Sequence, residues 1–216
     1  MVVATRQGIE SHAVRGRLNA ALFWGIDSYV HLLLGAKKRA LFGELPGTVL
    51  EIGAGTGANL RYYRPGTRLI AVEPNPHMHG ALARAARRRG ITLELRAEGA
   101  ESIGVPDGSV DAVVSTLVLC TVPDPVAAVR EVRRVLRPGG RFYFVEHVRA
   151  GDRTGYHALQ RAVAGPWGWF FEGCDVLRDT ERVLADGGFA GLTVDRYRLR
   201  SVFVPVNPQI AGVATR

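Results

Sequence analysis

The sequence has little cysteine and no apolar run long enough to cross a membrane. Its two cysteines, Cys120 and Cys174, do not have the spacing of metal ligands, and no signal peptide precedes them. We therefore expect a reduced protein in the cytoplasm. The apolar stretch at residues 20–34 spans only 15 residues and contains Asp27 and His31. This composition excludes a transmembrane helix there but leaves peripheral membrane contact open.

Internal repeats, low-complexity blocks and linkers rich in proline or serine are also absent, so the 216 residues are expected to form one domain. The formal net charge is +8, and nearly all of the basic residues are arginines scattered along the chain. The densest run, at residues 84–89, closes an expected helix, where cations complement the helix dipole. A solvated helix end explains this run better than a nucleic-acid surface does, so we expect no nucleic-acid partner.

The most informative segment is residues 48–59, in which an apolar strand pattern runs into a turn containing Gly53, Gly55 and Gly57. Glycine allows a tight turn and lets a ligand approach the backbone closely. A second apolar run ends in Glu73, 20 residues after Gly53. A carboxylate at that position suits hydrogen bonds to the two hydroxyls of a ribose. The pattern predicts a site for an adenosine-containing cofactor.

The glycines alone do not identify the cofactor, because Gly53-x-Gly55-x-x-Ala58 also fits the fingerprint of NAD enzymes. Glu51 favours a different cofactor. A carboxylate beside the turn would repel a pyrophosphate but would suit the cationic methionyl group of S-adenosylmethionine (SAM). Two later segments, 106–119 and 129–145, follow in the order typical of class I SAM-dependent methyltransferases. The ordered set resembles that class, and it is more specific than any of its parts.

Apolar periodicity predicts strands that alternate with helices after residue 47. Residues 18–42 are expected to form two helices split near Gly35, and residues 1–16 lack an apolar period and are expected to be loose. The expected strands are 48–53, 68–73, 92–97, 111–116 and 141–147, and the expected helices are 58–63, 76–89 and 124–136. After a less regular insert at 151–179, a helix at 180–187 precedes strands at 192–199 and 210–215, which are joined too closely for a parallel crossover.

The expected fold is α/β: a single Rossmann-like methyltransferase domain with a central, mostly parallel seven-stranded sheet and a C-terminal antiparallel hairpin. Residues 1–43 are expected to form an N-terminal helical cap that belongs to the same domain as residues 44–216. The insert at 151–179 follows the fifth strand, at the carboxyl edge of the sheet, where open α/β proteins bind their substrates. We therefore expect the insert on the substrate side.

Three segments narrow the resemblance: L-C-T-V at 119–122, F-V-E-H-V at 144–148 and the Gly-Cys pair at 173–174. With the cofactor segments, they make the chain similar, from residue 47 onwards, to the methyltransferase-like family that includes the mammalian alkyl-thiol S-methyltransferases. Members of that family carry a hydrophobic N-terminal anchor, and we expect this chain to differ from them in that respect. The resemblance implies an enzyme that uses SAM to methylate a small-molecule acceptor.

The resemblance also implies which residues contact the cofactor. Glu51 is expected to orient the methionyl ammonium group or the turn, and Glu73 to bind the ribose. The family commonly has aspartate where this chain has Gly99, so Ala100 or Glu101 is expected to contact the adenine amino group instead. The full expected set is Glu51, Gly53, Ala54, Gly55, Asn59, Glu73, Pro74, Asn75, Ala100, Glu101, Thr116 and Leu117.

Glu146 and His147 are the candidate catalytic pair, because they end the fifth strand at the expected cleft. His147 would be the general base for a hydroxyl acceptor, with Glu146 holding its tautomer, although adjacent strand residues point to opposite faces. Cys120 is interpreted as a small buried apolar residue. His77 and His79 lack a third ligand, so we expect no metal site there.

The function that the sequence favours is methyl transfer from SAM to a small molecule, with a lipophilic thiol as the expected acceptor. A thiol is partly ionised near neutral pH, so it requires no dedicated base. The alternatives are an N-methyltransferase of a phospholipid head group, an O- or C-methyltransferase of a metabolite, and a cofactor-fold protein associated with RNA. In the insert, Trp167, Trp169 and Phe170 either form the wall of an apolar acceptor pocket or cap the core.

Overall fold

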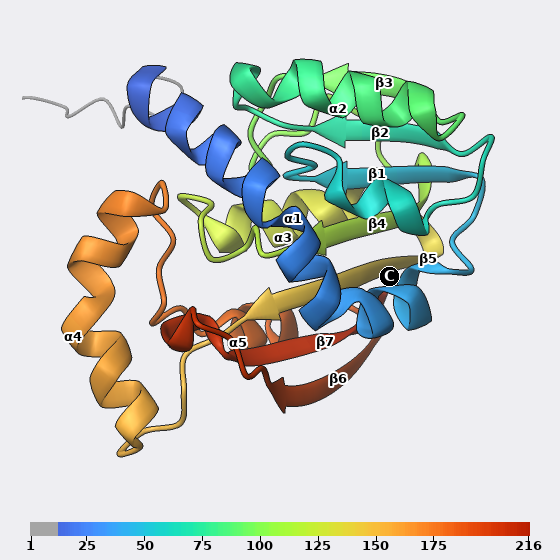
Figure 1. Cartoon of the computed structure of the whole chain (residues 1–216). Coiled ribbons are helices and arrows are strands. Elements are labelled where there is room, and N and C mark those ends of the chain that lie inside the picture. Colours follow the sequence, from blue (N-terminus) through green and yellow to red (C-terminus); the bar gives the residue numbers. More distant parts are fainter. Residues whose placement is uncertain (1–12) are drawn as a thin grey trace, which may run out of the picture.

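The computed structural model describes residues 13–216, and its helices flank one sheet (Figure 1). The strands are β1 (Thr48–Ile52), β2 (Arg68–Val72), β3 (Thr92–Arg96), β4 (Val110–Thr116), β5 (Leu136–His147), β6 (Gly191–Arg198) and β7 (Pro208–Thr215). The helices are α1 (Ala13–Phe42), α2 (Pro76–Arg88), α3 (Pro125–Val135), α4 (Gly155–Phe170) and α5 (Thr180–Ala185), with 3-10 turns η2 (Ala58–Tyr62) and η3 (Val204–Val206).

The strand order is β3-β2-β1-β4-β5-β7-β6. Strands β1 to β5 pair in parallel, whereas β7 is antiparallel to both β5 and β6. This topology confirms the predicted fold, a mostly parallel seven-stranded sheet that ends in an antiparallel hairpin. The strand order reverses between β1 and β4, and the carboxyl ends of strands at such a point form the usual ligand site of an open α/β sheet.

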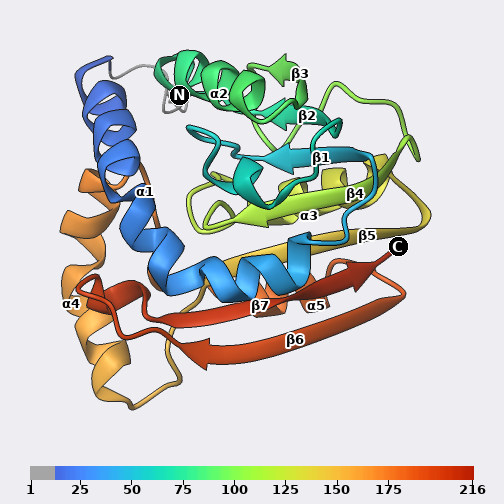
Figure 2. The ribbon, with the colours of Figure 1, turned by 45° about the vertical axis from the view of Figure 1, so that its right-hand side comes forward.

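Apolar side chains pack helices on both faces of the sheet. On one face, Leu34 and Phe42 of α1 lie in a cluster with Leu82 of α2. On the other face, Val132 of α3 and Leu184 of α5 lie in a second cluster. Helix α4 and the first turns of α1 instead lie beyond the arrowheads of the parallel strands (Figures 1 and 2). These two helices therefore flank the carboxyl edge of the sheet.

The N-terminal cap differs from the prediction, because α1 is one helix of 30 residues rather than two. Gly35 does not end a helix. A Cβ at this position would lie 3.1 Å from the ring of His31, so glycine leaves room for that ring. Residues 13–16, which were expected to be loose, form the start of α1. The same expectation for residues 1–12 lies outside the described residues.

Two other segments depart from the sequence pattern. The insert contains helix α4. Gln160 is the one buried residue of this helix, so its sequence shows only a weak apolar pattern. Thr154 caps α4 by accepting a hydrogen bond from the backbone N–H of His157. Strand β5 begins at Leu136 rather than at 141. Its early start is stabilised by two backbone hydrogen bonds of 3.0 Å at the end of the chain: Gly139 donates to the carbonyl of Arg216, and the N–H of Arg216 donates to the carbonyl of Gly140.

The surface agrees with two expectations from composition. Helix α2 ends at Arg88 with its last arginines exposed, so residues 84–89 do close a helix, as predicted. Among residues 13–216, no helix combines the length and the apolar character that crossing a bilayer requires.

Candidate cofactor and acceptor site

The glycine-rich turn joins β1 to η2 at the carboxyl edge of the sheet. Gly53, Gly55 and Gly57 have φ angles of 61°, 56° and 88°, which side chains other than glycine rarely adopt. A Cβ on Gly53 would lie 2.4 Å from Cγ2 of Val118, whereas the nearest atom to a Cβ on Gly55 would be the sulfur of Met78, at 3.7 Å. Gly53 therefore allows close packing against the loop after β4, whereas a Cβ on Gly55 would make only ordinary contacts.

Glu73 follows β2 and lies against the same turn. Its Oε2 accepts a hydrogen bond of 2.8 Å from the N–H of Gly55, and its Oε1 accepts one of 2.8 Å from the N–H of Asn75. The side chain is buried, and this burial raises the pKa of Glu73 despite the two bonds. Each carboxylate oxygen keeps a lone pair that can accept a hydrogen bond from a hydroxyl group. The arrangement fits a ribose placed over the turn.

A buried polar network lies beneath the turn and connects α1, β1, η2 and β4. Glu51 accepts hydrogen bonds of 2.7 Å from both the Asn59 amide and the Tyr63 hydroxyl. Asn59 also accepts a bond of 2.8 Å from the Lys38 ammonium and donates one of 3.0 Å to the Thr116 hydroxyl. Both oxygens of Glu51 thus bond to side chains in or just after η2, and its expected contact with the methionyl ammonium group or the turn backbone stays a prediction.

The sequence analysis missed two members of this network, Tyr63 and Lys38. The one signal for Lys38 was its rarity, because Lys37 and Lys38 are the only lysines in a chain with 28 basic residues. Lys38 is 3% exposed, and its burial lowers the pKa of the ammonium group to about 8. Burial likewise raises the pKa of Glu51 to about 7. The network is therefore expected to respond to pH near neutrality.

Glu51→Gln is expected to flatten the pH dependence of stability below neutrality. Between pH 4.5 and about 7, folded Glu51 keeps a proton that the unfolded chain releases, so the wild type loses stability as the pH rises through this window. Lys38, Tyr63 and Glu73 face this carboxyl group and remain in the variant. The decrease in the free energy of unfolding between pH 5 and pH 7, measured with urea, should be about 2 kcal/mol smaller in the variant than in the wild type.

Glu94→Gln is the control for this experiment, because Glu94 is paired with Arg68 and Arg96 at the surface. These arginines lower the pKa of Glu94, so it titrates below the window. The control should keep the wild-type slope. Equal slopes for the wild type and Glu51→Gln would show that Glu51 does not titrate near neutrality.

Glu146, at the end of β5, shapes the loop that follows β4. Its buried carboxylate accepts hydrogen bonds from the Ser115 hydroxyl and from the backbone N–H groups of Val118 (3.0 Å) and Leu119 (3.2 Å). Leu117, in the same loop, has a φ of 57°, a strained value that ordered surroundings must maintain. Glu146 therefore positions the loop that packs against Gly53.

The predicted pairing of Glu146 with His147 is wrong. The carboxylate is used by the loop after β4, and Nδ1 of His147 is buried without a hydrogen-bond partner. The physical reason is the alternation of side chains along a strand, which turns neighbouring residues to opposite faces. Whether His147 takes part in catalysis stays a prediction.

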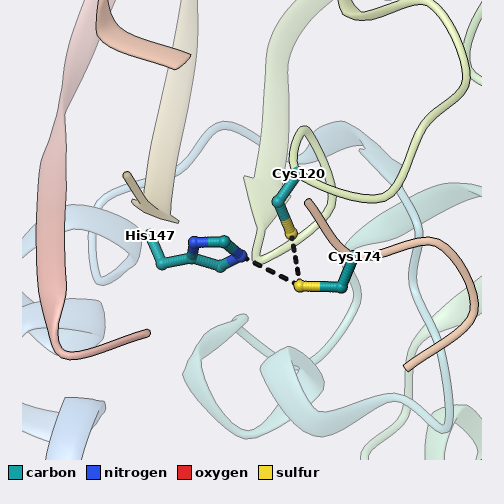
Figure 3. Close-up of side chains that lie close together, drawn as sticks. All are labelled: Cys120, His147 and Cys174. Carbon is teal, nitrogen blue, oxygen red and sulfur yellow. Dashed lines mark hydrogen bonds between the residues drawn. The ribbon is translucent and has the colours of Figure 1, made fainter. Parts of the chain in front are cut away.

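His147 instead faces two cysteines from other segments (Figure 3). Its Nε2 lies 3.1 Å from Sγ of Cys174, which in turn lies 3.7 Å from Sγ of Cys120. The Trp167 indole also donates to Sγ of Cys174, at 3.4 Å. The thiol–thiol hydrogen bond lowers the pKa of Cys174, and together with burial it raises the pKa of Cys120. Sequence analysis treated the three residues separately, although each lies in a segment particular to the family.

Aromatic side chains from three elements gather at the same edge of the sheet. The ring of Phe203, in the connection between β6 and β7, lies 6.3 Å from Tyr29 of α1, 6.4 Å from Trp167 of α4 and 6.3 Å from Phe171 (centroid distances). We call these four residues the aromatic cluster. Of the three aromatic residues considered in the insert, Trp167 belongs to it, whereas the other two are largely exposed: Trp169 at 69% and Phe170 at 50%.

The remaining predicted cofactor residues lie around the turn and the neighbouring strand ends. Asn75 caps α2 by accepting a hydrogen bond of 3.0 Å from the N–H of His77. Ala54 and Ala100 are buried. One oxygen of Glu101 accepts a bond of 3.2 Å from the N–H of Asp124, at the start of α3. Direct contact of these residues, Pro74 and Leu117 with a cofactor stays a prediction.

Comparison with known proteins identifies relatives in sequence and in fold. A family model described as a methyltransferase domain matches residues 50–144. Human thiol S-methyltransferase TMT1A is 38% identical over 194 residues, which cover 85% of this chain and 80% of the human protein. Phosphatidylethanolamine N-methyltransferase of Cereibacter sphaeroides is 36% identical over 55% of this chain and 59% of its own length. A solved SAM-dependent methyltransferase from Thermotoga maritima aligns with a TM-score of 0.67 over 94% of this chain and 99% of its own, at 19% identity.

The fold, the turn and these matches define a SAM-dependent methyltransferase. Within that class, the chain belongs to the methyltransferase family that includes the human thiol S-methyltransferases. This finding confirms the resemblance drawn from the sequence, and it decides against the NAD interpretation that the glycines alone had left open.

Proposed function

We propose that this protein transfers the methyl group of SAM to the sulfur of a lipophilic small-molecule thiol. The observation that carries the proposal is the 38% identity to a human thiol S-methyltransferase over 85% of the chain. The match to the phosphatidylethanolamine N-methyltransferase extends over only 55% of the chain, so the lipid head-group alternative has weaker support. The proposal requires no nucleic-acid partner.

The turn and the strand ends beside it would hold the cofactor. The absence of a side chain at Gly55 and the two oxygens of Glu73 suit the adenosine part, because they offer close approach and acceptors for the ribose hydroxyls. Glu51 lies beneath the same turn and would favour the cationic methionyl part. When bound, SAM supplies an electrophilic methyl group on a sulfonium.

The acceptor would lie between α1, α4 and the connection of β6 to β7. Methyl transfer to a thiol depends chiefly on alignment with the methyl group and on the exclusion of water. The aromatic cluster provides apolar surface for both tasks at the carboxyl edge of the sheet. A thiol acceptor with a pKa of about 8.5 is already partly ionised at neutral pH. A thiol acceptor therefore needs no general base, and the carboxylate of Glu146 can be used to position the loop after β4.

The proposal is tested by turnover on alkyl and aryl thiols, with alcohols and amines of the same carbon skeletons as matched acceptors. We expect methyl thioethers, detected by mass spectrometry, and little product from the other two series. Phe203→Ala should raise KM for long-chain thiols about tenfold, because an aromatic contact of roughly 1.5 kcal/mol is lost, and it should leave SAM affinity unchanged.

Val126→Ala, an exposed site on α3, is the control for this variant and should leave both constants unchanged. Methylation of phosphatidylethanolamine in vesicles, without turnover of any thiol, would contradict the proposed acceptor. It would favour the lipid head-group alternative instead.

A further inference from the structure

The cluster of Cys120, His147 and Cys174 is not explained by the methyl transfer described above. The two sulfurs and the imidazole nitrogen all lie within 4.8 Å of one another. They come from the loop after β4, the end of β5 and the segment after α4, and Figure 3 shows their side chains pointing toward one another. All three are buried. The chain spacing of the cysteines gave no indication of a metal site, because the cluster forms only in the folded chain.

We propose that Cys120, His147 and Cys174 bind one divalent metal ion of the zinc class through two thiolates and one imidazole. Zinc–sulfur bonds of about 2.3 Å in tetrahedral geometry place two sulfurs about 3.8 Å apart. The observed distance between the sulfurs of Cys120 and Cys174 is 3.7 Å. Nε2 of His147, now 3.1 Å from Cys174, would move away by about half an ångström.

The chemistry of the ligands also selects this class of ion. Thiolate and imidazole are soft or borderline ligands, which prefer zinc and similar transition metals to magnesium or calcium. Before an acceptor binds, the two thiolates also balance the charge of a divalent ion, so the metal-loaded site is neutral. Neutrality matters here because an uncompensated charge is costly to bury.

Hydrogen bonds hold the segments of the site together without an ion. Asp175, the residue after Cys174, donates a hydrogen bond of 2.9 Å from its N–H to the carbonyl of Cys120. The Arg178 guanidinium donates to the carbonyls of Leu119 (3.0 Å) and Val122 (2.6 Å), on either side of Cys120. The loop after β4 and residues 174–178 therefore form one rigid unit. Such outer contacts are a usual requirement for a well-defined metal site.

Three protein ligands leave one tetrahedral position for an external ligand, as in catalytic zinc sites. Among residues 13–216, no other histidine, cysteine or carboxylate belongs to the group as a fourth ligand. Resting on the proposed function, we assign this position to the sulfur of the acceptor thiol. The cluster lies at the carboxyl ends of β4 and β5, and the Trp167 indole connects it to the aromatic cluster.

The reaction balances in this arrangement. Coordination makes the acceptor thiol more acidic, and its proton leaves to solvent. A lone pair of the bound thiolate forms the new carbon–sulfur bond, while the electron pair of the breaking bond stays on the sulfur of the cofactor. The product is a neutral thioether, which is a weaker ligand than a thiolate and can leave the ion.

Cobalt binding tests the metal site. Reduced protein freed of metal with a chelator is titrated with Co²⁺, followed by competition with Zn²⁺. We expect one ion per chain, with sulfur-to-cobalt charge-transfer bands and tetrahedral absorption. Cys120→Ser, Cys174→Ser and His147→Gln should each weaken binding at least about 100-fold. His77→Gln, an exposed site on α2, is the matched control and should bind as the wild type does.

Circular dichroism and SAM titration of each variant establish that it is folded. The absence of charge-transfer bands in the wild type would overturn the metal site. Wild-type affinity in the folded variants of Cys120, His147 and Cys174 would overturn it as well.

The same cobalt protein tests the fourth position. An acceptor thiol should shift the cobalt bands, whereas the matched alcohol should not, and zinc-loaded protein should methylate thiols at least about tenfold faster than metal-free protein. Thiol methylation that does not depend on metal would overturn this assignment and leave the proposed function standing. Normal cobalt bands, together with no thiol turnover by either the zinc-loaded or the metal-free protein, would overturn the proposed function and leave the metal site standing.

Discussion

Replacing Glu73 with alanine is expected to weaken SAM binding about 100-fold. The variant would lose the two charge-assisted hydrogen bonds that we propose from Glu73 to the ribose, each contributing about 1.5 kcal/mol. The N–H groups of Gly55 and Asn75 also lose the acceptor that now fixes the turn against β2. Calorimetric titration of the wild type and the variant with SAM measures the change.

Two further variants show whether the effect belongs to the carboxylate. Glu73→Gln keeps one acceptor oxygen but puts a donor in place of the other, so an intermediate loss of about tenfold is expected. Glu94→Ala removes a surface carboxylate from the neighbouring strand β3 and should leave affinity unchanged. Wild-type affinity in Glu73→Ala would exclude this residue from the cofactor site.

Gly212→Ala is expected to have the largest effect on stability. Gly212 lies in β7 between β5 and β6, and a Cβ there would fall 1.9 Å from the carbonyl oxygen of Thr193 and 2.8 Å from the ring of Phe144. The first neighbour is the backbone of β6, which cannot give way without breaking the hairpin. We expect a loss of more than about 4 kcal/mol in the free energy of unfolding, measured by urea, or no soluble folded protein.

Gly191→Ala in the same hairpin is the matched control. A Cβ at Gly191 would meet no atom closer than Cβ of Thr215, at 4.0 Å. Its stability should therefore stay within about 0.5 kcal/mol of the wild type. Similar unfolding of the two alanine variants would mean that the space around Gly212 does not limit the packing of the hairpin.

The parts of the fold that could be predicted are those with a strong local pattern. The near-continuous apolar runs of β1, β2 and β4 indicate strands buried on both faces, and the short connection to the last strand requires an antiparallel hairpin. Helix α4 was missed because it buries only Gln160, so its sequence lacks a clear apolar stripe. Helix α1 was divided at Gly35 because glycine often ends helices, whereas here it makes room for His31.

In the candidate site, too, the residues marked by a local motif could be predicted and those that depend on distant contacts could not. The turn and Glu73 were predictable because each is marked by a short motif at a strand end. The contacts of Lys38 and Cys174 were not, since they depend on segments that meet only in the folded chain. Strand alternation indicated that Glu146 and His147 face different ways, but it could not show which loop or cluster each side chain meets.

The hydrogen bond from Lys38 to Asn59 limits how far the chain can be truncated from its N-terminal side. Residues 13–43 precede the first strand, and Lys38 lies in their last turns. Removing them would take away the ammonium group that binds Asn59 and lies near Glu51, leaving a buried amide and a buried carboxyl group without that partner. We therefore expect a truncated chain starting at residue 44 to lose part of the network beneath the glycine-rich turn. The smallest unit able to hold the cofactor turn in place includes the last turns of α1.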